Sequence, residues 1–237
     1  TTGTNKEEKD VKKILHKYSI TTEILTWKGK KPSKNIQSLA RNKRYELLFN
    51  QGNKFQISNI LLGHHRDDLL ENFFLRMLRG SGLKGLISFD KRNRIGEKKL
   101  LRPLLDQKKE DLIYIAKFVF NFYASDPTNQ DEKYRRIKVR KLIKELEKEG
   151  LDKKKFFETI KNLKYSNSVV DYCVKQNLKK NSFFSEKKNK LVLNEIFFSQ
   201  PYEVIFRSLS ESIKLIGKKY YPVRGKKLNK IITYLKK

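Results

Sequence analysis

The chain has 237 residues, with 55 lysines and arginines against 26 aspartates and glutamates, and a formal net charge of +29. This length allows one or two domains. A charge of this size indicates a polyanionic partner, with nucleic acid as the first candidate, although the lysine-rich composition of an AT-rich genome is an alternative explanation. No stretch reaches the roughly 20 apolar residues of a membrane span, and no signal peptide is visible. The single cysteine, Cys173, excludes an internal disulfide and fits a reducing cytoplasm.

The first third of the chain alternates between helical and strand patterns. Residues 11–18 are typical of the end of a helix, and residues 20–27 (ITTEILTW) have the composition of a strand. Apolar residues at helical intervals predict a helix over residues 36–49. The short apolar run 57–63 (ISNILLG), which ends in glycine, is typical of a buried parallel strand.

The next elements continue this alternation. A single apolar stripe predicts a helix over residues 67–79; its members are Leu70, Phe73, Phe74, Met77 and Leu78. Asp106 can cap a further helix that carries acidic residues in its first turn and LIYIAKFVF in its body. Strands that alternate with helices predict an α/β fold, a parallel sheet with flanking helices. We therefore expect a first domain over residues 1–150.

The pattern changes after about Gly150. Helical segments with lysine-rich joints follow, with one short strand expected near residues 190–198 (KLVLNEIFF). We predict a second, mainly helical domain over residues 151–237.

Rare polar residues gather between the strand that ends at Gly63 and the helix that begins near Asp67. In an open α/β sheet, ligands bind where the carboxyl end of a strand faces a helix N-terminus, and the free N–H groups there favour an anion such as phosphate. Asp67, Asp68 and Glu71 follow one another along the first helical turns, and a Mg²⁺ carried by a nucleotide would relieve their mutual repulsion. The loop residues His64 and His65 lie within reach of the same ligand.

Each of these features also has a purely structural explanation. Acidic residues in the first turn of a helix are ordinary partners of its dipole, and for Asp68 alone the two explanations weigh equally. Paired histidines can bind zinc, but no cysteine or third histidine stands at ligand spacing. The glycine-rich turn RGSG, residues 79–82, is weak evidence for phosphate contact when taken alone.

Four separated motifs, in order, carry a resemblance to a known family. They are LTWKGKKPSKNIQSLARNKRYELL (residues 25–48), GHHRDDLLENFFLRMLRGSGLKGL (63–86), LLRPLLD (100–106) and SDPTNQDEKYRRIKVR (125–140). The chain resembles the N-type ATP pyrophosphatases that act on tRNA, in particular the tRNA(Ile)-lysidine synthetases. The likeness covers about residues 11–149 and implies an adenine nucleotide alpha hydrolase-like fold. Beyond Gly150 only a general likeness to the family's helical linker, a tRNA-binding domain, is visible.

The resemblance implies an activity. Enzymes of this family use ATP, with Mg²⁺, to adenylate the wobble cytidine of a minor isoleucine tRNA with a CAU anticodon, and release pyrophosphate. The amine of L-lysine then displaces AMP and leaves lysidine, so that the tRNA reads AUA instead of AUG. The family also implies a cytoplasmic ligase, and its members often form homodimers.

The resemblance also assigns roles to residues, position by position. It places Asp67, Asp68 and Glu71 in catalysis and around Mg²⁺, and Gly63, His64 and His65 at the nucleotide. The Ala-Arg-x-x-Arg-Tyr element contains Arg41 and Arg44, and Arg41 is the expected phosphate or transition-state contact. A tRNA-facing or lysine-facing set follows: Arg79, Ser81, Gly82, Lys84, Arg135 and Arg140.

One departure from the family affects the expected activity. The family's first signature, Ser-Gly-Gly-x-Asp-Ser, forms the loop that grips pyrophosphate, and this sequence does not contain it. With a first residue that is not methionine, we expect a fragment, a split gene or a degenerate copy. An inactive basic RNA-binding module therefore remains an alternative. A tRNA 2-thiocytidine synthetase, whose signature is also similar to GHHRDD, needs paired cysteines, which a chain with one cysteine does not have.

Overall fold

The computed structural model describes residues 4–27, 29, 36–123, 135–185, 187, 189–217 and 225–235. The chain forms two compact units, Thr1–Leu151 and Asp152–Lys237, and each is described by itself. In the described part of the chain, no helix combines the length and the hydropathy that crossing a bilayer would require.

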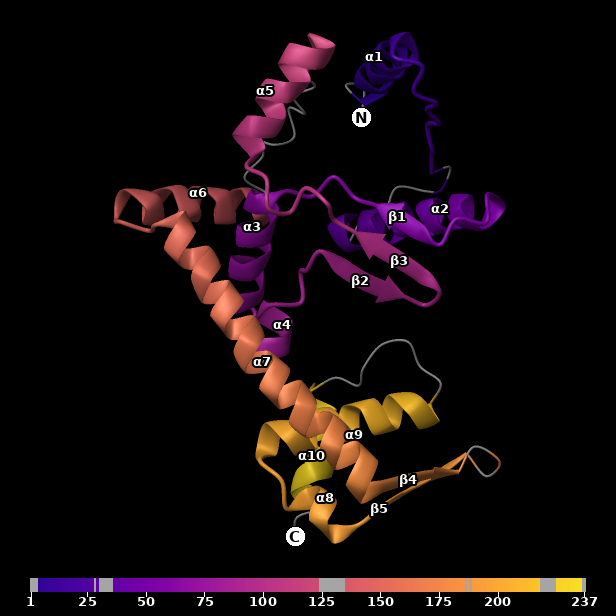
Figure 1. Ribbon diagram of the computed structural model, residues 1–237, viewed down its shortest axis with the longest axis vertical. Helices are drawn as coiled ribbons and strands as arrows, with labels where there is room; N and C mark the ends of the chain where they lie inside the picture. The colour runs from indigo at the N-terminus through magenta and orange to yellow at the C-terminus, as the bar shows by residue number, and fades with distance from the viewer. Residues whose placement is uncertain are drawn as a thin grey trace. The chain divides into compact units, whose positions relative to one another are not determined.

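The first unit combines helices with one small sheet (Figure 1). Its elements are α1 (Thr4–Lys17), α2 (Ile36–Lys54), β1 (Asn59–Leu61), α3 (Arg66–Met77), α4 (Leu83–Leu86), β2 (Arg92–Ile95), β3 (Lys98–Leu101), α5 (Lys109–Phe120) and α6 (Arg135–Lys148). The helices expected from apolar periodicity are present as α2, α3 and α5, and the strand at 57–63 is present as β1. The strand expected over residues 20–27 is wrong, because that segment has an irregular backbone.

The sheet is mixed rather than parallel throughout. Strand order is β1-β3-β2: β1 pairs with β3 in parallel, with Ile60 opposite Leu100, and β2 pairs with β3 antiparallel. A two-residue connection, Gly96–Glu97, joins β2 to β3, and Gly96 has the positive φ of +58° that such a tight turn needs. The expectation of a parallel sheet is therefore correct for β1 and β3 and wrong for β2. Among the described strands β1 pairs on one side only, and Leu61 at its end is 67% exposed.

The packing of α3 against α6 forms the centre of the first unit. From the predicted stripe, Leu70, Phe73 and Phe74 are buried, whereas Met77 and Leu78, at the end of the helix, are exposed. Three apolar residues of α6 are buried as well: Ile137, Val139 and Ile143. Burying side chains of this size contributes about 1.5–3 kcal/mol each, so this contact fixes α3 firmly.

Helix α5 has no buried residue among its twelve, although its sequence is the most apolar of the first unit. Tyr114 and Phe118 stack on its surface with ring centroids 6.0 Å apart, and Phe118 is 78% exposed. The ring of Tyr18, next to the end of α1, meets that of Phe120 edge to face, and its hydroxyl donates to the backbone oxygen of Val119. Apolar sequence therefore predicted the helix but not its burial.

The second unit is mainly helical and contains one hairpin. Its elements are α7 (Lys153–Asn181), β4 (Ser182–Ser185), β5 (Lys190–Leu193), α8 (Glu195–Phe198), α9 (Tyr202–Ile216) and α10 (Gly225–Leu235). The strand expected near 190–198 is present as β5, followed directly by α8, whereas β4 was not expected. A compact apolar core unites the later helices: Phe197, Ile205, Leu209, Leu228 and Ile232.

Buried polar contacts join α7 to α9. Arg207, which is 4% exposed, donates to the side chains of Asn167 at 2.6 Å and Asp171 at 3.1 Å. Further along the same pair of helices, Asn177 donates to the hydroxyl of Ser208 at 3.2 Å. Buried polar groups are costly unless they are hydrogen bonded, so these contacts select one register between the two helices.

Candidate active site

The loop between β1 and α3 lies at the carboxyl ends of the two parallel strands. The backbone N–H of Leu62 donates to the oxygen of Leu101 at 2.8 Å, and that of Arg66 donates to Gln107 at 3.0 Å. These bonds hold the loop against the segment that leaves β3. A Cβ at Gly63 would meet no described atom within 4 Å, so the space beside this glycine is open.

Asp67 and Asp68 both accept backbone hydrogen bonds at helix starts. The carboxylate of Asp68 accepts from the N–H of His65 at 3.0 Å, within its own first turn. The carboxylate of Asp67 accepts from the N–H of Lys109 at 3.2 Å, the first residue of α5. Asp67 therefore satisfies a free donor of α5, the role that the sequence had assigned to Asp106. That assignment is wrong, because α5 begins at Lys109 and Asp106 pairs with Lys91 instead.

Glu71 is buried and pairs with an arginine of α6. It is 4% exposed, and one of its oxygens accepts from Arg140 Nε at 2.5 Å, while the other has no partner among the described residues. Burial raises the pKa of Glu71, and the hydrogen bond and charge of Arg140 oppose that rise. In the described part of the chain, no three His, Cys, Asp or Glu side chains are grouped to hold a metal ion. The carboxylate oxygens of Asp67 and Asp68 are ligands of the kind that Mg²⁺ prefers, whereas Glu71 has one oxygen held by Arg140 and one without a partner among the described residues.

The two histidines differ in their surroundings. The ring of His64 meets Phe89 edge to face, with centroids 5.1 Å apart. Burial lowers the pKa of His64 to about 4; the carboxylate of Asp68 opposes this, and the charges of Arg102, Arg41 and Arg136 reinforce it. His64 is therefore neutral at pH 7, with one ring nitrogen that donates and one that accepts. His65 lies between the acidic pair, 3.7 Å from Asp67 and 3.5 Å from Asp68.

Arg102 contacts Phe89, the same ring that His64 meets. Its guanidinium lies over the Phe89 ring, 4.5 Å from the centroid, and it is buried. It donates to the backbone oxygen of Asp90 at 2.6 Å and to the side chain of Asn93. In the sequence this arginine stands within the LLRPLLD motif, and nothing there predicted its role.

A cavity of about 220 Å³ lies where α2, α3 and α6 meet, and arginines dominate its lining. We call it the arginine pocket; its lining residues are Arg41, Asn72, Leu75, Arg76, Arg79, Ser81, Arg135 and Arg136. Burial, with Arg41 and Arg79 nearby, lowers the pKa of Arg76, and Asn72 accepts from its Nε at 2.7 Å. Five guanidinium groups around one cavity with no lining carboxylate form a site for an anion with several oxygens, such as phosphate.

The structure brings only some of the predicted phosphate-contacting and tRNA-facing residues together in one pocket. Arg41, Arg79, Ser81 and Arg135 line the arginine pocket, and Arg41 also lies over the ring of Tyr45. Three predicted residues are outside the lining: Arg140 pairs with Glu71, Lys84 is exposed on α4, and Gly82 precedes that helix. Arg76 and Arg136 line the pocket but were not predicted, because the sequence gives no sign that they converge. Within the motifs at residues 25–48 and 125–140, residues 30–35 and 125–134 lie outside the described residues.

Comparison with known proteins gives one family and a consistent set of relatives. The PP-loop domain family matches residues 2–146. The tRNA(Ile)-lysidine synthase of Bradyrhizobium diazoefficiens is 33% identical over 166 residues, 70% of this chain and 46% of that protein. The same-named protein of Wolbachia sp. subsp. Brugia malayi is 31% identical over 209 residues, 85% of this chain and 47% of that protein.

A third relative extends the likeness over both units. The tRNA(Ile)-lysidine synthase of Anaplasma marginale is 28% identical over 235 residues, 96% of this chain and 49% of that protein. The chain thus spans about half the length of the curated relatives that it matches. The two histidines, the acidic pair and the arginine pocket all lie inside the match to the PP-loop family, which covers residues 2–146. Because this match covers well over half of the chain, the chain belongs to the PP-loop family of ATP-binding domains.

Proposed function

We propose that this chain provides the adenylation site and the adjoining helical unit of a tRNA(Ile)-lysidine synthase. The observation that carries the proposal is the arginine pocket, because two of its lining residues, Arg41 and Arg136, are among the charges that lower the pKa of His64. A nucleotide polyphosphate and an RNA backbone are both anions that such a pocket suits. The relatives named for this activity support the same assignment.

The proposed reaction has two steps. The C2 carbonyl oxygen of the wobble cytidine attacks the α-phosphorus of ATP, and pyrophosphate leaves. The ε-amine of lysine then attacks C2, and AMP and a proton leave. Mg²⁺ bound with ATP would neutralise phosphate charge, with Asp67 and Asp68 as its carboxylate ligands.

The protein's own groups would then position the nucleotide and the base, and stabilise the charge that develops on the phosphates. Arg41 and Arg136 supply fixed positive charge where negative charge develops on the phosphates, which is the largest single contribution in many such reactions. Neutral His64 offers a donor and an acceptor to a base without adding charge. Asp67, which holds the start of α5, keeps that helix and α3 aligned around the ligand. The isoleucine tRNA, L-lysine, a cytoplasmic location and a homodimer remain predictions.

The chain alone is expected to release no pyrophosphate from ATP, even with tRNA(Ile) and lysine present. Its sequence contains no Ser-Gly-Gly-x-Asp-Ser loop, so the arginine pocket and the acidic pair can hold only one side of the nucleotide. The measurement is pyrophosphate release by the purified chain, beside the same chain fused to the phosphate-loop segment of a curated relative. Turnover by the chain alone would contradict this expectation. No lysidine formation by the fusion would count against the proposed function itself.

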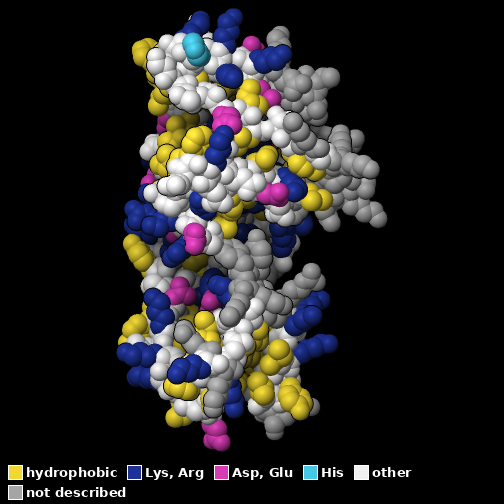
Figure 2. Space-filling view, turned by 90° about the vertical axis from the view of Figure 1, so that its right-hand side faces the viewer, with side chains coloured by type: hydrophobic (Ala, Val, Ile, Leu, Met, Phe, Trp, Pro, Cys, Tyr) yellow, Lys and Arg dark blue, Asp and Glu magenta, His cyan; other side chains and the backbone are white. Residues whose placement is uncertain are grey.

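Binding of tRNA to the chain alone should depend steeply on salt. Lysine and arginine side chains are spread over the face shown in Figure 2, in both units. Contacts to about six phosphates give a log–log slope of roughly −5 for affinity against salt, because each contact releases counterions. Replacing Arg79 and Arg135 by glutamine should reduce the slope by about two.

A second double variant distinguishes the contribution of the arginine pocket to tRNA binding from the contribution of total charge. Lys12 and Lys13 are exposed on α1, away from the pocket, and their replacement by glutamine removes the same two charges. Filter binding over a salt series should leave the slope of that variant nearly unchanged. Equal slopes for the two double variants, or an affinity for tRNA that does not change with salt, would favour the alternative explanation, in which the positive charge reflects the composition of an AT-rich genome.

A further inference from the structure

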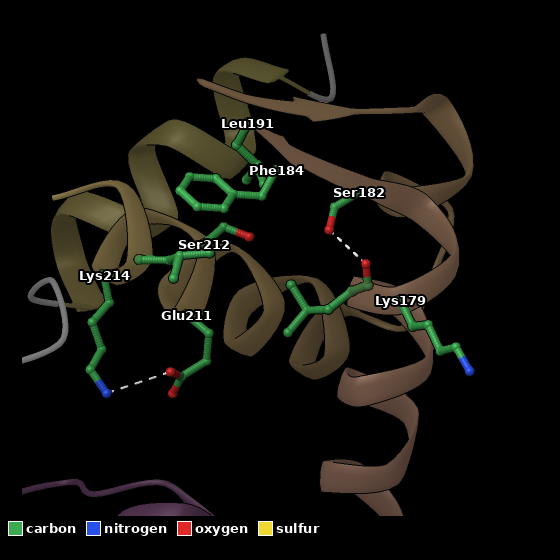
Figure 3. Close-up of a pocket in the computed structure, with 9 residues that line it drawn as sticks. Lys179, Ser182, Phe184, Leu191, Glu211, Ser212 and Lys214 are labelled. Carbon is green, nitrogen blue, oxygen red and sulfur yellow. Dashed lines mark hydrogen bonds and ion pairs between the residues drawn. The ribbon is translucent and has the colours of Figure 1, made fainter. Parts of the chain in front are cut away.

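The second unit contains a large pocket between its hairpin and α9. Its volume is about 720 Å³, and we call it the hairpin pocket; the residues that matter here are Leu178, Phe184, Leu191, Ser212, Lys214 and Leu215. Figure 3 shows Phe184 and Leu191 of the hairpin on one side and Glu211, Ser212 and Lys214 of α9 on another. Ligand pockets commonly have about 300–1,000 Å³, so this one has room for a small organic group with its substituents.

The hairpin register explains why one aromatic ring faces this pocket. Phe184 on β4 stands opposite Leu191 on β5, so both side chains lie on the same face of the hairpin. The neighbouring pair, Phe183 opposite Val192, lies on the other face, and Phe183 is 70% exposed. Alternation along a strand therefore gives one half-buried aromatic wall and one solvent-facing ring in consecutive positions.

Ser212 contributes to the pocket lining a buried hydroxyl that has no hydrogen-bond partner among the described residues. It is 2% exposed, and no described residue hydrogen bonds to its Oγ. One turn earlier on α9, the equally buried Ser208 receives a hydrogen bond from Asn177. Most buried polar atoms have a partner, so a hydroxyl without one, on the wall of a pocket, indicates a ligand that would supply it.

The charge around the pocket decides what kind of ligand this is. Residues 152–237 contain 21 lysines and arginines against 7 acidic residues. At the pocket itself, Lys214 is 3.6 Å from Glu211, and Lys179 has no carboxylate partner among the described residues. An occupant that combines an apolar, stackable body with negative charge and a polar edge would match this lining and the basic surface of the second unit.

We propose that the hairpin pocket binds one unstacked nucleotide of an RNA. The base lies against Phe184 with Leu191 and Leu215 around it, its polar edge meets the Ser212 hydroxyl, and the adjoining phosphates approach Lys179 and Lys214. Single-stranded RNA is recognised in this way, by aromatic stacking together with lysine contacts to the backbone. The proposal rests on the proposed function only for the identity of the RNA, since any RNA with an unpaired nucleotide presents the same chemistry.

The test measures binding of the full chain to a labelled oligouridylate, which does not stack on itself, and to an RNA duplex. Phe184→Leu keeps an apolar wall and removes the ring, and is expected to weaken oligouridylate binding on the order of tenfold, the loss of one base–aromatic stack. Duplex binding should change by less than about twofold, because a paired base cannot enter the pocket. Phe183→Leu, on the opposite face of β4, is the matched control and should change neither affinity.

Two further measurements keep the outcome decisive. Ser212→Ala should weaken oligouridylate binding by a factor of about three to ten, the net value of one hydrogen bond. A 4-thiouridine oligonucleotide should crosslink to the hairpin of the unmodified chain, a result that does not depend on how any variant folds. The absence of a crosslink to the hairpin, or equal oligouridylate affinity for Phe184→Leu and Phe183→Leu, would overturn the proposal. Salt-dependent binding through the arginine pocket would survive that result, so the proposed function is tested separately.

Discussion

Replacing Asp68 by asparagine is expected to lower the rate of lysidine formation by about 10²–10³, as the loss of one transition-state contact does. The protein for this test is the chain fused to the phosphate-loop segment of a curated relative. The asparagine side chain retains an oxygen that can accept from the N–H of His65, the bond that Asp68 makes at 3.0 Å. Only the negative charge is lost, so folding should be preserved while the Mg²⁺-bound nucleotide is misplaced.

The measurement is single-turnover lysidine formation beside a filter-binding curve for tRNA with the same protein. Affinity for tRNA should hardly change, because Asp68 contributes no positive charge. If Asp68 only supports the helix dipole, its charge is worth under about 1 kcal/mol of stability and activity should survive. Asp111→Asn, at an exposed acidic position in the first turn of α5, is the control and should leave the rate unchanged.

Replacing Arg140 by methionine should destabilise the first unit by about 3–5 kcal/mol, since it leaves the buried carboxylate of Glu71 without its partner. The same change should leave most of the apolar packing between α3 and α6 in place. Lys138→Met, at an exposed position of the same helix, removes an equal charge and should cost less than about 0.5 kcal/mol. Denaturant unfolding of the three proteins gives the comparison.

The stability deficit of Arg140→Met should depend on pH. Burial raises the pKa of Glu71 above its ordinary value, and without Arg140 only the more weakly acting charge of Arg136 opposes that rise. A raised pKa means that the folded state holds the proton more tightly than the unfolded state, so stability falls as pH rises through the range between the two values. The variant should therefore recover part of its loss as pH falls toward the ordinary glutamate pKa. Adding Glu71→Leu should also restore stability at neutral pH, and a deficit that neither change reduces would show that the ion pair is not its cause.

Elements with strong apolar periodicity were predictable, and elements defined by pairing were not. Helix α3 follows from the spacing of Leu70, Phe73 and Phe74. Residues 20–27 have the composition of a strand, but none of the described strands pairs with them, and a strand is stable only within a ladder. The hairpin of β2 and β3 was missed because its strands are rich in lysine and arginine. Its one local signal was Gly96 at a two-residue turn.

The candidate site shows the same limit. The acidic pair and the two histidines are adjacent in sequence, so their grouping could be predicted from the loop between one strand and one helix. The residues that line the arginine pocket come mainly from α2, α3 and α6, and no spacing rule connects Arg41 on α2 with Arg136 on α6. The pairing of Glu71 with Arg140 is equally remote in sequence, and no local pattern indicated it.

One side of β1 pairs with none of the described strands, and this affects how the protein can be handled. An edge strand with unpaired N–H and C=O groups is a template for pairing with another molecule, and the exposed Leu61 adds an apolar contact at its end. A net charge of +29 keeps the molecules apart at low ionic strength. Salt that strips contaminating RNA from the protein during purification also shortens the reach of that repulsion, to about 3 Å at 1 M. Washing away nucleic acid and preventing self-association therefore require opposite solvent conditions.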